Sequence, residues 1–157
     1  MADPIIRRAV EEDIADIRTL TIRAYTKWVE ITPRPPRPMT ADYNQAFADH
    51  RFDLLVDQGR LIGLVETVAE GDELMIVNVA VEPERQGQGH GFTLMRHAGE
   101  IARLSGLAGT RLYTNKLMTS NIALYERLGY EFEKETHHDL GTVAVHMKYS
   151  FSPRRDK

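Results

Sequence analysis

The apolar residues in the first third of the chain follow a helical pattern. Between Ile14 and Trp28 they recur every three or four residues, which predicts an amphipathic helix that begins near Glu11. Ile5 to Ala9, just before it, predicts a short strand. The opening of the chain is therefore expected to be a strand followed by a helix with one buried face.

Prolines interrupt the helical pattern between positions 33 and 38. Each proline lacks a backbone donor and restrains the residue before it, so this segment predicts a semi-rigid loop rather than a longer helix. Thr40 is then expected to cap a short helix over Ala41 to Ala48.

The middle of the chain has strand patterns separated by turn residues. Strands are predicted at Phe52 to Val56, Leu61 to Val68 and Leu74 to Val81, with turns at 57–59 and 71–72. The last of these strands is apolar on both faces except at Asn78, which predicts a central, buried strand.

The last third returns to alternating helices and strands. The first is a helix that ends at Gly106 and whose apolar face consists of Leu94, Met95, Ala98, Ile101, Ala102 and Ser105. A strand at Arg111 to Thr114 and a helix from Thr119 or Ser120 to Leu128 follow. Strands at Tyr130 to Thr136 and Thr142 to Tyr149 then flank a turn at 139–141. Residues 150–157 are expected to form a frayed polar tail.

Composition narrows the class of protein. The chain has 157 residues, 42% of them hydrophobic and 27% charged, with a net charge of -3, which suits one domain and gives no reason to expect a nucleic acid or an anionic membrane as partner. The absence of cysteine excludes disulfides and a thiol nucleophile, and the six histidines lack metal-ligand spacing. No signal peptide or membrane-spanning run is visible, so a cytoplasmic protein without a metal is expected.

A glycine-rich loop joins the strand ending at Val81 to the following helix. Alternate glycines allow positive φ and close approach of a ligand, and the helix N-terminus offers free N–H groups, so the loop predicts a pyrophosphate site rather than an unliganded turn. Gly89-His90-Gly91 lacks the Lys-Ser/Thr of a nucleotide triphosphate loop, and Phe92 replaces the last glycine of a dinucleotide motif. The residues expected to hold the pyrophosphate are Gln86, Gly87, Gln88, Gly89, His90 and Gly91.

Two motifs carry a family resemblance. Val81-x-Pro83-x-x-Gln86-x-x-Gly89-x-Gly91 resembles the acyl-CoA-binding motif of the GNAT superfamily of N-acetyltransferases, and Leu124 to Tyr130 resembles that family's downstream segment, in the same order and at a usual separation. The resemblance implies an α/β fold, a single domain with a mixed, strongly twisted sheet of six or seven strands flanked by helices. It also implies transfer of an acetyl group from acetyl-CoA to a primary amine of a small molecule or peptide, by a monomer or homodimer. A non-catalytic acyl-CoA-binding sensor or interaction module is the alternative.

The resemblance assigns roles to several residues. Tyr125 would be the general acid, and its phenol pKa of about 10 is close enough to that of a thiol to protonate the departing sulfur; a packing role in the core is the alternative. The pantetheine arm would bond the main chain of Val79 and Val81, with the Val79 N–H facing the thioester carbonyl. Where the family often has asparagine and alanine, this chain has Met118 and Asn121. Asn121 shares a helical face with Tyr125 and is the first choice for a cofactor contact, with Asn115 second.

The acceptor side is predicted from residue types. Glu66 lies in an otherwise apolar strand, so partial burial would raise its pKa and suit it to act as general base; a solvated glutamate is the alternative. Asn78 could position a water molecule. The resemblance places residues 28–39 over the acceptor entrance, where Trp28 would supply an apolar wall and Arg34 and Arg37 would bind an acidic group beside the amine, unless both arginines are simply solvated.

Overall fold

The computed structural model describes residues 3–138 and 141–151 of the chain. Its strands are β1 (Ile5–Arg8), β2 (Arg51–Asp57), β3 (Arg60–Glu70), β4 (Glu73–Val81), β5 (Gly109–Asn115), β6 (Glu131–His137) and β7 (Val143–Ser150). The α-helices are α1 (Ile14–Tyr25), α2 (Arg37–Thr40), α3 (Tyr43–Asp49), α4 (His90–Leu104) and α5 (Thr119–Arg127). Short 3₁₀ turns η1 (Glu11–Asp13), η2 (Thr26–Trp28) and η3 (Pro83–Arg85) complete the order.

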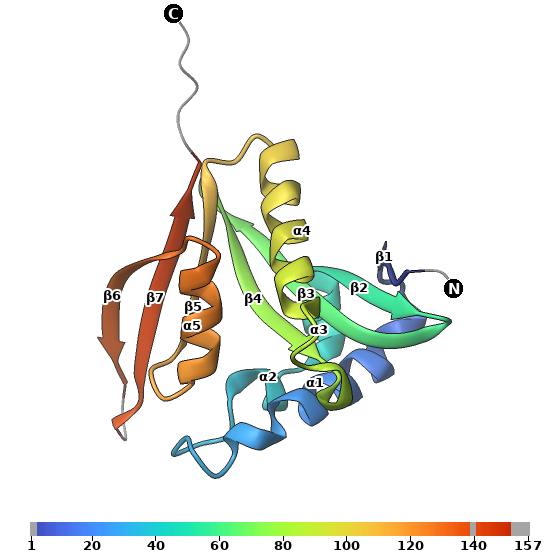
Figure 1. Cartoon of the computed structure of the whole chain (residues 1–157), viewed down its shortest axis with the longest axis horizontal. Coiled ribbons are helices and arrows are strands. Elements are labelled where there is room, and N and C mark those ends of the chain that lie inside the picture. The colour runs from blue at the N-terminus through green and yellow to red at the C-terminus, as the bar shows by residue number, and fades with distance from the viewer. Residues whose placement is uncertain (1–2, 139–140, 152–157) are drawn as a thin grey trace, which may run out of the picture.

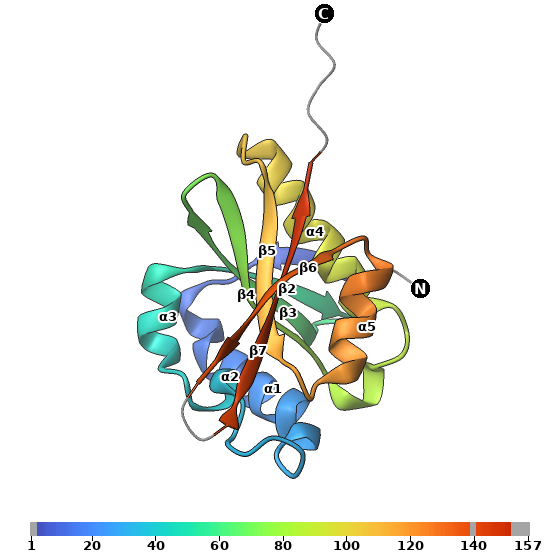
Figure 2. The same ribbon diagram turned by 90° about the vertical axis from the view of Figure 1, so that its left-hand side faces the viewer.

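The strands form one mixed sheet, as the sequence predicted. Its order is β1-β2-β3-β4-β5-β7-β6, and among the described residues β4 and β5 form the only parallel pair. Figure 2 shows the strong twist, since β5 and β7 run almost upright while β2 and β3 cross behind them. The predicted α/β class with seven strands is therefore confirmed.

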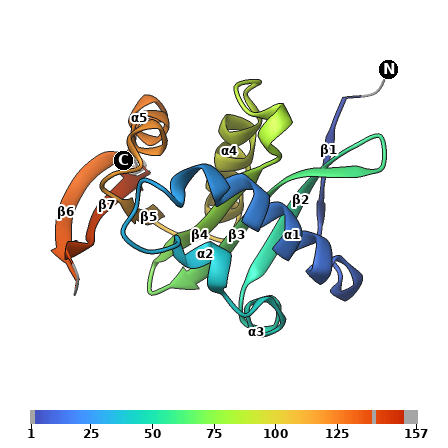
Figure 3. The ribbon, with the colours of Figure 1, turned by 90° about the horizontal axis from the view of Figure 1, so that it is seen from below.

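Helices cover both faces of the sheet. Figure 3 shows α1, α2 and α3 on one side and α4 and α5 on the other. The α4 face buries the apolar stripe of that helix, including Leu94, Met95 and Ala98, against the centre of the sheet. The α1 face buries Ile17 and Leu20 in a separate core with neighbouring strands. Burial of these stripes against two faces of one sheet is what positions the helix ends that reach the site.

Local structure corrects some predicted boundaries. Thr40 does not cap the short helix; instead Asp42 accepts bonds from the N–H groups of Asn44 and Gln45, and the helix starts at Tyr43. The proline segment is not loop throughout, because a single helical turn, α2, starts at Arg37. Proline is tolerated there because the first turn of a helix leaves its N–H groups without intrahelical partners.

The end of the chain also differs from the prediction. Ser150 belongs to β7 rather than to a frayed tail, and the Phe151 N–H donates to the carbonyl of Ala108 at 2.9 Å. The predicted turn residues 139–140 and the remaining tail, 152–157, lie outside the described residues.

Candidate active site

The parallel strands β4 and β5 separate soon after they meet, as Figure 1 shows. They pair only over Glu73 to Met75 on β4, opposite Gly109 to Arg111 on β5. A register shift in the β3–β4 ladder leaves Val77 as an extra residue, 37% exposed. The prediction that the whole strand is buried on both faces is therefore wrong at Val77. From there to Val81 one edge of β4 has no partner strand.

The main chain of Val79 and Val81 points to this open edge. The Glu82 N–H donates to the carbonyl of Ile62 on the β3 side at 2.8 Å. Backbone groups alternate along an antiparallel ladder, so the N–H and C=O groups of the odd-numbered residues 79 and 81 point away from β3. The structure thus exposes the backbone groups that the sequence interpretation assigned to a cofactor arm.

Two side chains reach the carbonyls on the open edge. The Tyr25 hydroxyl donates toward the carbonyl of Val79 at 3.2 Å, and the Gln86 side-chain amide donates to that of Val81 at 3.0 Å. The Lys27 ammonium donates to Gln86 Oε1 at 2.8 Å, and burial lowers the lysine pKa. The end of α1 and η2 therefore contacts both the edge and the start of the glycine loop.

The glycine loop presents a row of backbone donors. None of the N–H groups from Gly87 to Phe92 has a hydrogen-bond acceptor within the described part of the chain; the next, that of Thr93, donates to the Gly89 carbonyl at 3.0 Å. Gly89 is the N-cap of α4, and no side chain caps that terminus. Free donors at the positive end of a 15-residue helix form a site for an anion.

Glycine is required at two positions of this loop. Gly87 and Gly89 have φ values of +81° and +87°, which other residues rarely adopt. A Cβ at either position would have no protein atom within 4 Å, so their outer side is open. The loop therefore has the open space and the free backbone donors that a pyrophosphate site requires, and the assignment of Gln86 to Gly91 to that site stays a prediction.

Tyr125 lies on α5 with its ring buried, 9% exposed, and packed 6.2 Å from the ring of Tyr130. The hydroxyls of the other two buried tyrosines are bonded, Tyr43 to the Pro38 carbonyl and Tyr130 to Thr110. Tyr125 alone of the three has a hydroxyl without a partner among the described residues, and this oxygen is not fully enclosed. Burial raises the pKa of Tyr125 and keeps its phenol protonated.

A buried polar network lies beneath β3 and β4 on the α1 face. Asn78 Oδ1 accepts the Tyr25 hydroxyl at 3.0 Å, and its amide donates to Thr21 at 3.3 Å and toward Tyr43 at 3.5 Å. Glu66 is paired with Asn78 in the strand register. These side chains come from two helices and two strands, so only the tertiary fold brings them together.

Glu66 is almost fully buried, with 3% exposure, and is not the solvated strand-face residue of the alternative interpretation. Its Oε2 lies 2.6 Å from Nδ1 of His50, which follows α3. Burial raises the Glu66 pKa, and bonds to His50 and Asn78 oppose the rise. A carboxyl with a raised pKa can exchange a proton near neutral pH.

Tyr25 and Tyr125 lie on helices that cover opposite faces of the sheet. Burial, and then the Tyr125 side chain, raise the pKa of Tyr25 well above its ordinary value. Tyr25 ends α1 and Tyr125 lies on α5, and these helices cover different faces (Figure 3). Of these two phenols, Tyr25 is the one that contacts the open edge of β4, through the Val79 carbonyl.

The two candidate asparagines differ in their surroundings. Asn115 ends β5, where its Oδ1 accepts the Leu117 N–H at 2.9 Å and stabilises a turn. Asn121 lies in the first part of α5, where its amide contacts only the sulfur of Met118, at 3.7 Å. The Asn121 amide keeps more of its hydrogen-bonding capacity, which favours it as the cofactor contact.

The predicted acceptor residues are dispersed. Trp28 is buried, 7% exposed, and offers little surface as a wall. Arg34 and Arg37 are both exposed, the first in the loop before α2 and the second at its start. Pro33 lines a small cavity of about 100 Å³ with the β5–α5 connection and the start of β7, so this segment does lie beside the end of β5.

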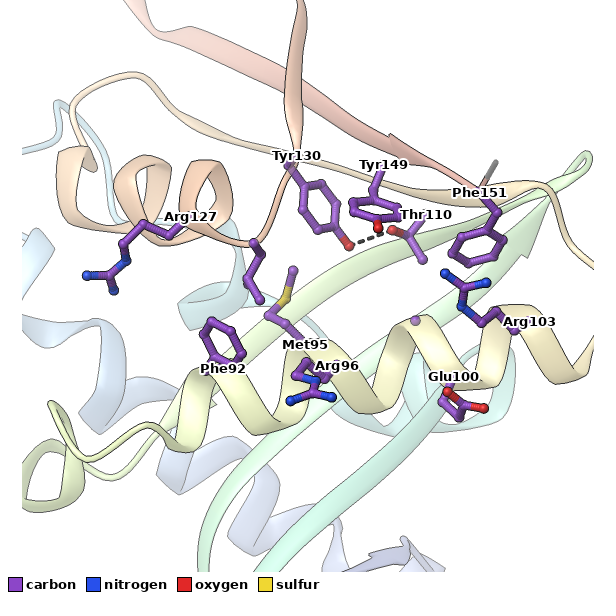
Figure 4. A pocket seen from close by; sticks show the side chains of 12 residues that line it. Phe92, Met95, Arg96, Glu100, Arg103, Thr110, Arg127, Tyr130, Tyr149 and Phe151 are labelled. Atoms are coloured by element: carbon purple, nitrogen blue, oxygen red, sulfur yellow. Dashed lines mark hydrogen bonds between the residues drawn. The ribbon is translucent and has the colours of Figure 1, made fainter. Parts of the chain in front are cut away.

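A larger groove of about 390 Å³ runs along the outer side of α4. Figure 4 shows Tyr130, Tyr149 and Phe151 on one wall and Arg96 and Arg103 on the helix opposite. The rings continue from Tyr125 through Tyr130 to Tyr149 and Phe151, with centroids about 6 Å apart at each step. This aromatic row holds the buried face of α5 and thereby fixes where Tyr125 stands.

Sequence reasoning missed Tyr25, Tyr43, His50 and Lys27 as site residues. Tyr25 stood in the apolar stripe of α1, and its place in the last turn before the proline segment was the available signal. Nothing in the sequence indicated Tyr43 or His50, because their positions depend on how α3 packs. Among the described residues no cluster could hold a metal ion, and no helix there is long and apolar enough to cross a bilayer.

Comparison with known proteins identifies the family. The model of the acetyltransferase (GNAT) family matches residues 14–130. The [ribosomal protein bS18]-alanine N-acetyltransferase of Escherichia coli K12 is 33% identical over 76 residues, covering 48% of this chain and 51% of that protein. The chain thus spans about half the length of the curated relatives it matches.

Solved structures share the fold over nearly the whole chain. The E. coli ribosomal-protein-S18-alanine N-acetyltransferase superposes with a TM-score of 0.77 at 22% identity, covering 98% of this chain and 99% of that one. PaiA N-acetyltransferase from Thermoplasma acidophilum, in complex with coenzyme A, gives 0.75 at 17% identity and covers 94% and 100%. An aminoglycoside 6'-N-acetyltransferase complexed with coenzyme A gives 0.76 at 16% identity and covers 97% and 99%. With its glycine loop and split sheet, the chain belongs to the GNAT family of acetyltransferases, which use acetyl-CoA.

Proposed function

We propose that this protein transfers an acetyl group from acetyl-CoA to a primary amine by direct attack, without a covalent enzyme intermediate. The main support for the proposal is that the open edge of β4 and the backbone donors of the glycine loop are continuous. The open edge of β4 at Val79 and Val81 leads directly into the donor row from Gly87 to Phe92. One extended ligand with a peptide-like arm and a pyrophosphate can satisfy both.

The bound cosubstrate would supply an acetyl group activated as a thioester. Gln86 to Gly91 would hold its pyrophosphate, and the backbone of Val81 would hold its arm. The Val79 N–H would face the thioester oxygen and stabilise the negative charge that develops there. Asn121 would add a side-chain contact from α5.

Tyr125 would act as general acid toward the departing sulfur. Its hydroxyl has no competing partner among the described residues, and its raised pKa keeps the proton in place until negative charge develops on sulfur. The aromatic row behind it restricts its movement. These features support an acid in a fixed position rather than a tyrosine that only packs.

Glu66 would accept the proton that the amine must lose. Burial raises its pKa toward the range in which a base works near neutral pH. Its partner His50 has a side chain that is 27% exposed, so the buried carboxyl is connected to the surface of the protein. The amine would enter from the α1 face, opposite the cofactor.

The acceptor would carry an acidic group beside its amine, as an amino acid or a related metabolite does. Arg34 and Arg37 are exposed beside the proline segment, where a carboxylate could reach them. The names of the similar proteins include acceptors as different as a ribosomal protein's alanine and an aminoglycoside. A peptide amine is therefore the principal alternative to a small acceptor.

The proposal is tested by release of free thiol from acetyl-CoA with a panel of primary amines. Tyr125→Phe should lower turnover about 10²- to 10⁴-fold and leave the coenzyme A dissociation constant nearly unchanged, since only a proton donor is lost. Tyr149→Phe is the matched control, because Tyr149 is in the same aromatic row and its hydroxyl also has no partner in the described region. A protein that binds acetyl-CoA but releases no thiol with any amine would be the non-catalytic module instead.

A further inference from the structure

The Tyr25 hydroxyl is the only side-chain group of α1 that reaches the unpaired edge of β4 within the described residues. Its oxygen lies 3.2 Å from the Val79 carbonyl and 3.0 Å from Asn78 Oδ1. The N–H and C=O of one strand residue point to the same side, so this hydroxyl stands beside the Val79 N–H assigned above to the thioester oxygen. A group at this point borders the place where the acceptor amine would meet the thioester.

The hydrogen bonds of the Tyr25 hydroxyl use its proton and leave the lone pairs of its oxygen available toward the open edge of β4. Both of its partners, the Asn78 amide oxygen and the Val79 carbonyl, can only accept, so the phenol proton is directed into the protein. No N–H or O–H group of the described chain donates to the Tyr25 oxygen. The phenol therefore offers lone pairs, and the ligand chemistry that fits is an N–H donor.

The network below holds the ring in place. Asn78, which accepts the Tyr25 proton, is itself fixed by Thr21 and Tyr43 and lies beside Glu66 in the strand register. Burial, and then the Tyr125 side chain, raise the pKa of Tyr25, so its phenol stays protonated. An amine held at the Tyr25 oxygen would thus lie between the group that stabilises the thioester carbonyl and the carboxyl that takes up its proton.

We propose that Tyr25 orients the acceptor amine, accepting a hydrogen bond from one amine N–H through its phenol oxygen so that the nitrogen lone pair faces the thioester carbon. This role rests on the proposed acetyl transfer. Tyr25 neither gains nor loses a proton in it. Tyr25 would therefore favour acceptor amines with two N–H groups, one that donates to its oxygen and one that loses its proton during the transfer.

The first experiment compares two matched variants, Tyr25→Phe and Tyr43→Phe. Both remove a hydroxyl that contacts Asn78, but only Tyr25 reaches the strand edge. Using the best amine from the panel, we expect Tyr25→Phe to lower kcat/KM about tenfold, the size of one net hydrogen bond, with an unchanged acetyl-CoA dissociation constant. Tyr43→Phe loosens Asn78 but leaves the Tyr25 hydroxyl at the strand edge, so it should lower kcat/KM by a clearly smaller factor, about threefold. Equal losses in both variants, or weakened acetyl-CoA binding in Tyr25→Phe, would show that Tyr25 only supports the fold.

The second experiment keeps the ring and its bonds and changes only the basicity of the oxygen. Replacing Tyr25 with 3-fluorotyrosine makes the phenol oxygen a poorer acceptor and a better donor. If the oxygen accepts from the amine, kcat/KM should fall; a rise, or no change, overturns the proposal. Because wild-type protein is assayed alongside, absence of any amine acetylation would instead count against the proposed function.

Discussion

The two sides of β4 differ in the groups that they offer for hydrogen bonding. On the α4 side the site consists of backbone N–H groups from consecutive residues of one loop. On the α1 side it consists of side chains from two helices and two strands, bonded through Asn78. Backbone donors suit a ligand that does not vary, whereas a side-chain network can be altered one residue at a time. Under the proposed function, the backbone side would hold the constant cofactor and the side-chain network would face the acceptor.

The largest effect is expected from a substitution that blocks the backbone donors of the glycine loop. Gly89→Asp places a carboxylate at a residue with φ +87° beside the donor row, so both strain and charge oppose an anion. We expect coenzyme A binding to be lost, together with the stabilisation of about 2.7 kcal/mol that it gives at 100 times the dissociation constant. Calorimetric titration and thermal unfolding with coenzyme A measure the two effects.

Gly59→Asp provides the control for this experiment. Gly59 has φ +80° in the β2–β3 turn and, like Gly89, open space at its Cβ position. It should lose intrinsic stability to a similar degree while binding coenzyme A normally. Normal binding by the Gly89 variant would show that the loop does not hold the pyrophosphate.

A smaller effect is expected on the side-chain half, at Glu66. As a base Glu66 works only when ionised, so activity falls as pH drops through its pKa. Burial raises that pKa above the ordinary value of about 4.3, so the acid limb of kcat/KM should lie closer to neutrality. Glu66→Gln should flatten this limb and lower the rate above it by about 100-fold.

The pH profile also distinguishes a base from a residue that only supports the network. His50→Gln removes the 2.6 Å contact to Glu66 and keeps the carboxyl, so the limb should persist and shift. With the compensating His50 bond gone, burial would raise the Glu66 pKa further and move the limb to higher pH. An unchanged limb in Glu66→Gln would assign the proton to another acceptor.

The smallest effect is expected at the outer rim of the acceptor side. Arg34→Ala combined with Arg37→Ala should weaken kcat/KM for an amino acid by a few-fold and leave its amide unaffected, since exposed ion pairs contribute about 0.2–1 kcal/mol. The comparison of acid and amide within each variant is the internal control. Equal losses for both acceptors would remove the carboxylate from the proposal.

The sequence predicted the parts of the fold that depend on local patterns. The apolar stripe of α1, the hairpin turn at Gly59 and the glycine loop each involve residues close in the chain, and the structure has all three. Asp42 was missed as a cap, because Thr40 and Asp42 are both good capping residues and only the chain path selects between them.

The conformation of the glycine loop could be predicted because it depends on residues that are adjacent in the sequence. Alternating glycines between a strand and a helix permit positive φ, which Gly87 and Gly89 adopt, and they provide no side chain to cap the helix N-terminus. The side-chain network on the α1 face could not be predicted, because it forms only when elements distant in the sequence pack together. The separation of β4 from β5, the bulge at Val77 and the docking of α3 decide that Tyr25, Asn78 and Glu66 share one network. Interactions between residues far apart in sequence depend on the whole core, so only the tertiary structure decided where the proton acceptor and the amine would meet.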